Sequence, residues 1–269
     1  MEKSDLNPSK QKKKKIARLG IGTKGVVYLL IGGLTAWEAF GRGGKKTGSN
    51  GALKFVIDQP FGQVLLWLVV LGLAGYVFWR MYQTFKDTED KGNDSKGIMY
   101  RLGYFSSGIF YLFIIFNALQ LLIGGGSGGN GGGKESMIQQ LLSQEYGRWI
   151  VASIALIFLI RAIIQIFIAF SGKFKDKVKE SGMNNKAQQL MISSGRVGYT
   201  SRGIVVGVIA YLTVRAAISY DASKSGGTKD AFNFIQNEFG GVVLGVIALG
   251  MLAFGLFLIF KASQHKMDF

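Results

Sequence analysis

Six apolar runs, each long enough to cross a lipid bilayer, constrain this chain more than any other feature of its sequence. At the helical rise of about 1.5 Å per residue, about 20 apolar residues cross a hydrocarbon core of about 30 Å. The runs lie near residues 19–40, 61–83, 102–123, 149–170, 197–218 and 240–260. The chain is therefore predicted to be an all-α membrane protein with six transmembrane helices.

The basic residues are distributed unevenly between the segments that connect these runs. The formal charge of +16 would suggest a nucleic-acid partner if the chain were soluble. Segments 1–18, 80–101, 171–196 and 261–269 hold 20 Lys and Arg residues, whereas segments 41–60, 124–148 and 219–239 hold 8. By the positive-inside rule both termini are predicted to be cytoplasmic, with residues 1–16 as a basic tail. The charge therefore indicates orientation and attraction to anionic lipids, and no nucleic-acid partner is expected.

Residue types that commonly perform catalysis or hold metals are scarce. The chain has no cysteine and a single histidine, His265, in its polar C-terminal tail. Disulfides, thiol nucleophiles and thiolate metal sites are excluded, and a histidine metal site is not expected. The spans contain no recognisable acid–base pair or activated nucleophile. Neither a metal, a cofactor nor an enzymatic activity is therefore predicted.

One helix start occurs three times along the chain. It reads RLGIGTKGVVYLLIG at residues 18–32, RLGYFSSGIFYLFII at 101–115 and RVGYTSRGIVVGVIA at 196–210. Each copy begins with Arg and has Gly two and seven positions later. A further shared glycine follows 44 to 46 residues after each Arg, at Gly62, Gly147 and Gly240. A fixed period marks a repeated structural unit, so we place repeats at 17–87, 100–171 and 195–263 within a single membrane domain of residues 1–269.

Each repeat contains two spans, and this fixes how the repeats can be related. An even number of crossings gives all three repeats the same orientation, so their symmetry axis runs along the membrane normal. A pseudo-threefold bundle is therefore predicted. Before each shared glycine, apolar residues recur at i, i+3, i+4 and i+8, which predicts a short interfacial helix on the outer side. These residues are Leu53, Val56, Ile57 and Phe61; Ile138, Leu141, Leu142 and Tyr146; and Ala231, Phe234, Ile235 and Phe239.

The repeated pattern can be written R-x-G-x-x-[KRS]-G-[VI], with an aromatic residue at Tyr28 and Tyr111. Together with QPFGQVLLWLVVLGLAGYVFWR at residues 59–80, it resembles the bacterial membrane family called domain of unknown function 1206. The resemblance covers nearly the whole chain. It implies a six-span protein of the bacterial cytoplasmic (inner) membrane, and it implies no activity. The chain departs from the pattern at Ser107, Val206, Glu145 and Glu238.

The first Arg of each repeat, at Arg18, Arg101 and Arg196, stands at the predicted cytoplasmic border of a span. A long cationic side chain at such a border can extend to the lipid phosphates while its stem stays in the apolar region. We therefore predict that these three residues anchor the protein to lipid headgroups. A contact with a substrate is the alternative.

Polar residues continue into the spans on one helical face. In the first span the face carries Lys24, Tyr28, Thr35 and Glu38, and the equivalent positions of the later repeats include Ser107, Tyr111, Arg202 and Thr213. Arg161 lies within the fourth span, where the equivalent residues are aromatic, so stacking on an aromatic ring is one interpretation. These nine residues form a predicted pathway or ion-binding site. Snorkelling of the cations and ordinary helix packing are the alternatives.

Two classes of function follow from this pattern. A channel or transporter would pass a small ion or polar solute along the pseudo-threefold axis, with Lys24 and Arg202 favouring anions. A non-catalytic scaffold or auxiliary subunit would instead bind a membrane-protein partner, anionic lipid or a second copy of the chain. The two hypotheses differ in whether the axis is wet or packed, which the sequence does not decide.

Overall fold

The computed structural model describes residues 8–41, 46–86, 92, 94–123, 138–171, 178 and 184–263, and these residues form helices and short connections without a strand. The helices are α1 (Pro8–Ala39), α2 (Ser49–Ile57), α3 (Gly62–Lys86), α4 (Ser95–Leu122), α6 (Gly147–Ser171), α8 (Asn185–Ser219) and α9 (Thr228–Ser263), with a short 3-10 helix η2 (Ala222–Lys224). Within the described ranges, six helices are long and apolar enough to cross a membrane. The prediction of an all-α, six-span protein is confirmed.

Local sequence explains where several helices begin and bend. The side chain of Asp94 accepts a hydrogen bond from the Gly97 amide at the start of α4, and Asn184 caps α8 in the same way. Gly240 divides α9, because its φ of 85° lies in a region that L side chains rarely adopt. Residues 228–239 thus form the short helix predicted before this shared glycine, and the last span follows it.

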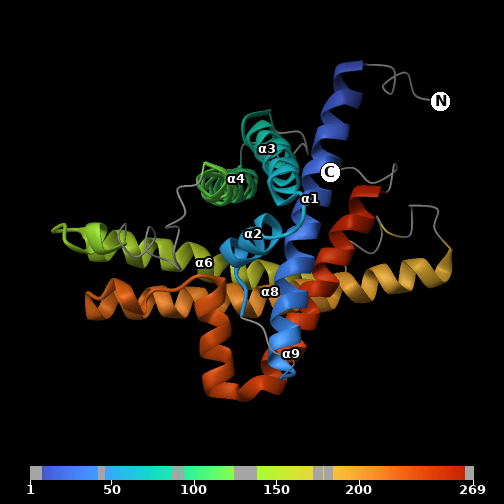
Figure 1. The fold of residues 1–269 in the computed structure, drawn as a ribbon. Coiled ribbons are helices and arrows are strands. Elements are labelled where there is room, and N and C mark those ends of the chain that lie inside the picture. Colours follow the sequence, from blue (N-terminus) through green and yellow to red (C-terminus); the bar gives the residue numbers. More distant parts are fainter. Residues whose placement is uncertain are drawn as a thin grey trace.

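The six long helices pair between neighbouring repeats in a closed cycle. Figure 1 shows α1 beside α9 and α6 beside α8, with α3 beside α4 viewed nearly end-on. Each pair joins the second span of one repeat to the first span of the next, and the last repeat closes onto the first. The three pairs run in different directions, as successive applications of a threefold rotation require. The predicted pseudo-threefold arrangement of three two-helix repeats is present.

The glycine seven residues after each repeated Arg holds these pairs together. A methyl group added at Gly25, Gly108 or Gly203 would collide with the second span of the preceding repeat. The facing residues are Ile259 on α9, Met81 on α3 and Ile166 on α6, which occupy one equivalent position 19 residues after the shared glycines. In a bilayer, small residues allow the close backbone approach on which helix association depends.

The glycine two residues after each Arg has a different partner. Gly20 lies against the backbone of Tyr76 in the second span of its own repeat, and Gly198 lies against Phe254 in the same way. A methyl group at Gly103 would meet no atom within 4 Å. Consistent with this, α4 and α6 make almost no contact among the described residues. The second repeat is therefore the one whose two spans are separated.

The buried apolar core reflects the same asymmetry. Its residues come from α1, α3, α4, α8 and α9, with contributions from α2 and Val178, and among the described residues α6 adds none. The buried face of α6 is instead a stripe of alanines, Ala155, Ala162 and Ala169, in a helix that packs along α8. Helix α6 thus lies at the periphery and exposes most of its apolar surface.

The three short amphipathic helices bury only part of the predicted face. Leu53, Ile138 and Ile235 are buried as expected. The fourth position of the pattern is exposed in all three repeats, where Phe61, Tyr146 and Phe239 are 84%, 69% and 61% exposed. The first two short helices end at residues 57 and 142, so Phe61 and Tyr146 lie in the turn that follows. Exposed aromatics at this level suit a membrane–water interface.

Candidate functional site

Polar side chains from two of the repeats meet at the hydroxyl of Tyr76. The Lys24 ammonium donates to this oxygen at 3.1 Å, and the Arg80 Nε donates to it at 2.9 Å. The Ser107 Oγ lies 3.1 Å away on the other side. Lysine and arginine can only donate, so they occupy the two acceptor positions of the hydroxyl and direct its proton toward Ser107. Tyr76 therefore fixes Lys24 and Ser107, which occupy equivalent positions of repeats one and two.

Aromatic rings cover the cations of this cluster. The Lys24 Nζ lies 4.7 Å from the centre of the Tyr76 ring and 5.0 Å from that of Tyr111. The Arg202 guanidinium, the equivalent of Lys24 in repeat three, lies 5.3 Å from the rings of both Tyr28 and Phe254. The negative face of an aromatic ring stabilises a cation at such distances. Equivalent positions of all three repeats thus contribute to one aromatic and cationic cluster.

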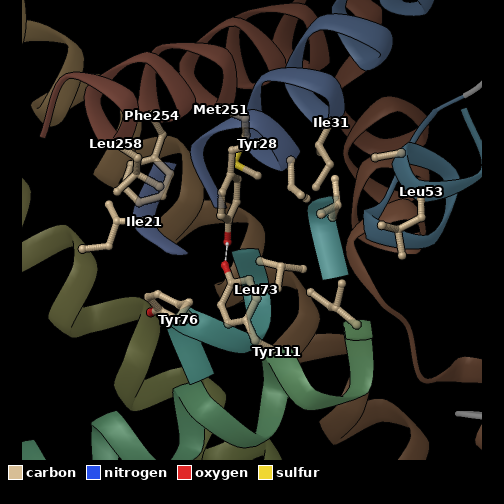
Figure 2. Packing of buried hydrophobic residues seen from close by; sticks show 14 of the residues in the cluster. Ile21, Tyr28, Ile31, Leu53, Leu73, Tyr76, Tyr111, Met251, Phe254 and Leu258 are labelled. Carbon is tan, nitrogen blue, oxygen red and sulfur yellow. Dashed lines mark hydrogen bonds between the residues drawn. The ribbon is translucent and has the colours of Figure 1, made fainter. Parts of the chain in front are cut away.

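Two tyrosines close the space between the repeats at this level. Figure 2 shows the hydroxyl groups of Tyr28 and Tyr111 pointing at each other from α1 and α4. The two oxygens are 3.4 Å apart. Both side chains are buried, and their rings stand edge-to-face against Phe254 and Tyr76 respectively. Edge-to-face packing holds the rings in fixed orientations. The centre of the protein is therefore packed at this level.

The cluster lacks negative charge. Within the described ranges, no carboxylate pairs with Lys24, Arg161 or Arg202. The Arg202 Nε is buried without a hydrogen-bond partner, and Lys24 is repelled by both Arg80 and Arg202. Uncompensated buried cations are costly in protein and more so in lipid. Among the described residues, Lys24, Arg161 and Arg202 are therefore not compensated by a carboxylate.

Arg161 makes a contact between helices, which is the packing alternative given for it above. Its Nη1 donates to the Ser106 Oγ at 3.1 Å, so it joins α6 to α4, and within the described part of the chain it does not stack on a ring. The equivalent residues Tyr76 and Phe254 pack against the first spans of their own repeats, whereas α4 is too far from α6 for this contact. Within the cluster, contacts with aromatic rings are made by Lys24, Arg80 and Arg202.

The outer part of the predicted stripe is not assembled around the axis. Thr35 is buried, and its hydroxyl accepts a hydrogen bond from the Thr47 amide that precedes α2. The Thr213 hydroxyl donates to the Ile209 carbonyl of its own helix. The Glu38 Oε2 is buried without a hydrogen-bond partner near the end of α1. The structure thus brings together Lys24, Tyr28, Ser107, Tyr111 and Arg202, and it leaves Thr35, Glu38 and Thr213 outside this cluster.

The three repeated arginines at the span borders differ from one another. The Arg101 Nε donates to the Thr84 carbonyl at 2.6 Å, near the end of α3. Arg18 is half-buried, and Arg196 is exposed. A cation near the last carbonyls of a helix is favourable because these groups carry partial negative charge. Arg101 therefore contacts a helix end, and anchoring of the three residues to lipid headgroups stays a prediction.

Sequence reasoning missed Tyr76 and Arg80 as members of the cluster. Both lie in the longest apolar run of the first repeat, four residues apart and hence on one helical face. That spacing of a Tyr and an Arg within a span is the signal that could have identified them. Among the described residues, no three His, Cys, Asp or Glu side chains lie close enough to hold a metal ion.

With this geometry established, comparison with known proteins gives the family. The family described as Domain of Unknown Function (DUF1206) matches residues 19–87, 102–172 and 197–264. The chain belongs to this family. It is 31% identical over 255 residues to the uncharacterized protein YxxB of Bacillus subtilis (strain 168), and the match covers 94% of this chain and 92% of that protein. No solved structure matches the chain significantly. The predicted resemblance is confirmed, and the chain is a multi-pass membrane protein with three tandem repeats.

Proposed function

We propose that this protein binds a small anion where its three repeats meet and passes that anion across the membrane along the pseudo-threefold axis. The observation that carries the proposal is the cluster of cations around Tyr76 and Tyr28, in which Lys24 and Arg202 have no carboxylate partner among the described residues. The proposal involves no enzymatic step.

The chemistry of the cluster suits a small anion. The Lys24 ammonium has three N–H donors and the Arg202 guanidinium has five. Within the described residues, only one of these eight donors has a hydrogen-bond acceptor, namely the Lys24 donor that bonds to Tyr76. An anion between Lys24 and Arg202 would accept the remaining donors and reduce the repulsion between the two cations. Rings of cationic side chains serve the same purpose in anion-selective pores.

The contact between Tyr28 and Tyr111 corresponds to a closed state. Because the two hydroxyls lie 3.4 Å apart, they leave no space for an ion between them. Passage therefore requires the first spans of repeats one and two to separate at this level.

The orientation follows from the charge distribution. We place both termini in the cytoplasm and the protein in the bacterial inner membrane, in agreement with the excess of basic residues in the segments on that side. Lys24 lies six residues, about 9 Å along the helix, beyond Arg18. The cationic cluster would then lie nearer the cytoplasmic surface and would concentrate anions there.

Anion flux into liposomes tests the proposal. Protein reconstituted at fixed orientation is expected to pass chloride, nitrate or phosphate, and Lys24→Gln or Arg202→Gln is expected to lower that flux by about tenfold if each removes about 1.4 kcal/mol of anion stabilisation. Lys54→Gln is the matched control, because Lys54 is exposed on α2. Negligible flux of all three anions in the wild type and all variants would overturn the proposal.

A scaffold or auxiliary subunit is the second candidate, favoured by the exposed apolar face of α6. Ile157, Ile163 and Phe167 are all about half exposed on this helix. A stoichiometric membrane-protein partner recovered by affinity purification, and lost when Ile163 and Phe167 are replaced by Ala, would support this candidate. Recovery of the chain alone from several detergents would count against it.

A further inference from the structure

The separated spans of repeat two have a cause that is visible in the sequence. In repeats one and three, a hydroxyl side chain of the first span packs directly against a glycine of the second span. Thr23 packs against Gly72, and Ser201 packs against Gly250. The equivalent residue of repeat two is Ile157. A branched side chain at this position excludes the close approach that Ser106 would otherwise make. Ile157 therefore accounts for the separation of the two spans in repeat two.

The exposure of side chains at equivalent positions shows that the two spans of repeat two are separated. Phe110 on α4 is 39% exposed, whereas its equivalents Val27 and Val205 are 3% and 1% exposed. On α6, Ile164 is 36% exposed, and its equivalents in the other repeats are almost completely buried. We define the α4–α6 seam by Gly103, Ser106, Phe110, Ile157, Arg161 and Ile164, which occupy positions that are packed between the spans in repeats one and three.

The seam combines an apolar lining with one cation. Arg161 is half-buried in the seam and is repelled by Arg202, and among the described residues it donates only to the neutral hydroxyl of Ser106. The remaining side chains of the seam are mostly apolar and face the region that hydrocarbon occupies in a bilayer. A molecule that fits must be apolar along most of its length and negatively charged at one end.

We infer that the α4–α6 seam binds an anionic membrane lipid, with an acyl chain along Phe110 and Ile157 and the headgroup phosphate on Arg161. The bond from Arg161 to Ser106 keeps the guanidinium at the seam and leaves its other N–H groups for phosphate oxygens. Ser106 lies only five residues, about 7.5 Å along α4, from Arg101 at the membrane border. A headgroup can therefore reach Arg161 by a short descent from the interface.

A lipid fits this seam better than a second copy of the chain does. Helices associate closely in bilayers through small residues, whereas Phe110, Ile157 and Ile164 are bulky. Flexible acyl chains adapt to such an uneven surface. Close helix packing in this chain is instead found at glycine contacts, such as Gly25 against α9. Charge complementarity further favours an anionic headgroup over a zwitterionic one.

Photolabelling in nanodiscs tests the inference. Two probes carry the same diazirine acyl chain, one on phosphatidylglycerol and one on phosphatidylcholine, and labelled peptides are mapped by mass spectrometry. We expect the anionic probe to label Phe110 and Ile157 about threefold more than the zwitterionic probe, the ratio expected of an ion pair worth about 0.6 kcal/mol. Arg161→Gln should bring the ratio to about one, whereas Arg161→Lys should retain most of it.

Two further variants separate a lipid site from nonspecific labelling. Gly103→Trp fills the open space of the seam and should reduce labelling there by both probes. Leu71→Trp places the same residue on the exposed face of α3 and should change nothing at the seam. Equal labelling of every outward apolar face, without dependence on headgroup, would overturn the inference. So would spontaneous disulfide dimers of a Gly103→Cys variant, since the chain has no other cysteine and a second copy would then occupy the seam.

The inference shares only Arg161 with the proposed anion pathway, and the two can fail separately. Headgroup-dependent labelling that persists in Lys24→Gln, together with absent anion flux, would retain the lipid site and reject the pathway. Flux of inorganic anions that depends on Lys24, together with headgroup-independent labelling, would give the opposite result.

Discussion

The hydroxyl oxygens of Tyr28 and Tyr111 lie 3.4 Å apart where the first spans of repeats one and two converge. The third repeat has Val206 at the equivalent position, so only two of the three repeats contribute a hydroxyl. The pair closes the centre of the molecule, and it breaks the pseudo-threefold symmetry because repeat three does not take part. The pair lies directly beside Lys24. Its packing therefore bears on whether an anion could pass Lys24, as proposed.

Replacing Tyr111 by the residue of repeat three is expected to open this closure. Tyr111→Val removes a ring that is 1% exposed and leaves a cavity beside Lys24, so we expect anion flux in liposomes to rise. Loss of a large buried side chain should also lower the free energy of unfolding by roughly 2–5 kcal/mol. Tyr111→Phe keeps the ring and should cost only about 1 kcal/mol, with little change in flux. Tyr211→Phe, at an exposed tyrosine, is the control. A Tyr111→Val variant that folds and shows no increase in flux would contradict a role for this pair in closing the axis.

The three equivalent glycines near the helix starts are expected to differ in their tolerance of a methyl group. Gly20→Ala and Gly198→Ala place a Cβ against the backbone of Tyr76 and Phe254, and overpacking of this kind costs roughly 1–3 kcal/mol. Gly103→Ala should change stability by no more than about 0.5 kcal/mol, because no atom lies within 4 Å. Thermal unfolding of the three variants in one detergent provides the comparison. Equal destabilisation by all three would show that repeat two is closed in solution.

Much of the fold could be predicted because its determinants are repeated. The six apolar runs gave the number of spans, and the spacing of glycines such as Gly25 and Gly62 gave the three repeats. What spacing could not give was the partner of each glycine. The structure shows that the glycine at Gly25 contacts the preceding repeat and the one at Gly20 contacts its own repeat. Because the two glycines contact different repeats, the helix pairs form a closed cycle.

The candidate site was predicted only in part, for a physical reason. Helical periodicity places Lys24, Tyr28 and Thr35 on one face of α1, but periodicity does not reveal which segment of that face meets the other repeats. The amide of the loop residue Thr47 donates a hydrogen bond to the hydroxyl of Thr35, and Lys24 donates one to the second-span residue Tyr76. Contacts between elements distant in sequence thus decide which polar residues join the cluster. The separation in repeat two could have been predicted from Ile157, which replaces a glycine.

Tyr76 is expected to be the most sensitive hydroxyl in the cluster. Tyr76→Phe introduces the residue that repeat three has at this position, and it leaves Lys24, Arg80 and Ser107 without their common partner. Hydrogen bonds to charged groups contribute about 1.5–3 kcal/mol, so a loss of that order in the free energy of unfolding is expected. In a Lys24→Met background the same change should cost less, because one of the donors is already absent. Denaturant unfolding of the four members of this double-mutant cycle measures the difference. Strictly additive effects would contradict the direct bond between Lys24 and Tyr76.

Exchanging one residue between repeats should move the separation of spans from one repeat to another. Ile157→Gly restores the glycine found at Gly72 and Gly250, so we expect α4 and α6 to approach and Ser106 to contact residue 157. Gly72→Ile should separate α1 from α3 and destabilise the protein by roughly 1–3 kcal/mol, because Thr23 then has no space. Spin labels on cysteines introduced at Phe105 and Leu156 report the first change as a shorter distance by electron paramagnetic resonance. The chain has no cysteine of its own, so the labels are unambiguous. An unchanged distance in Ile157→Gly would show that Ile157 alone does not hold the two spans apart.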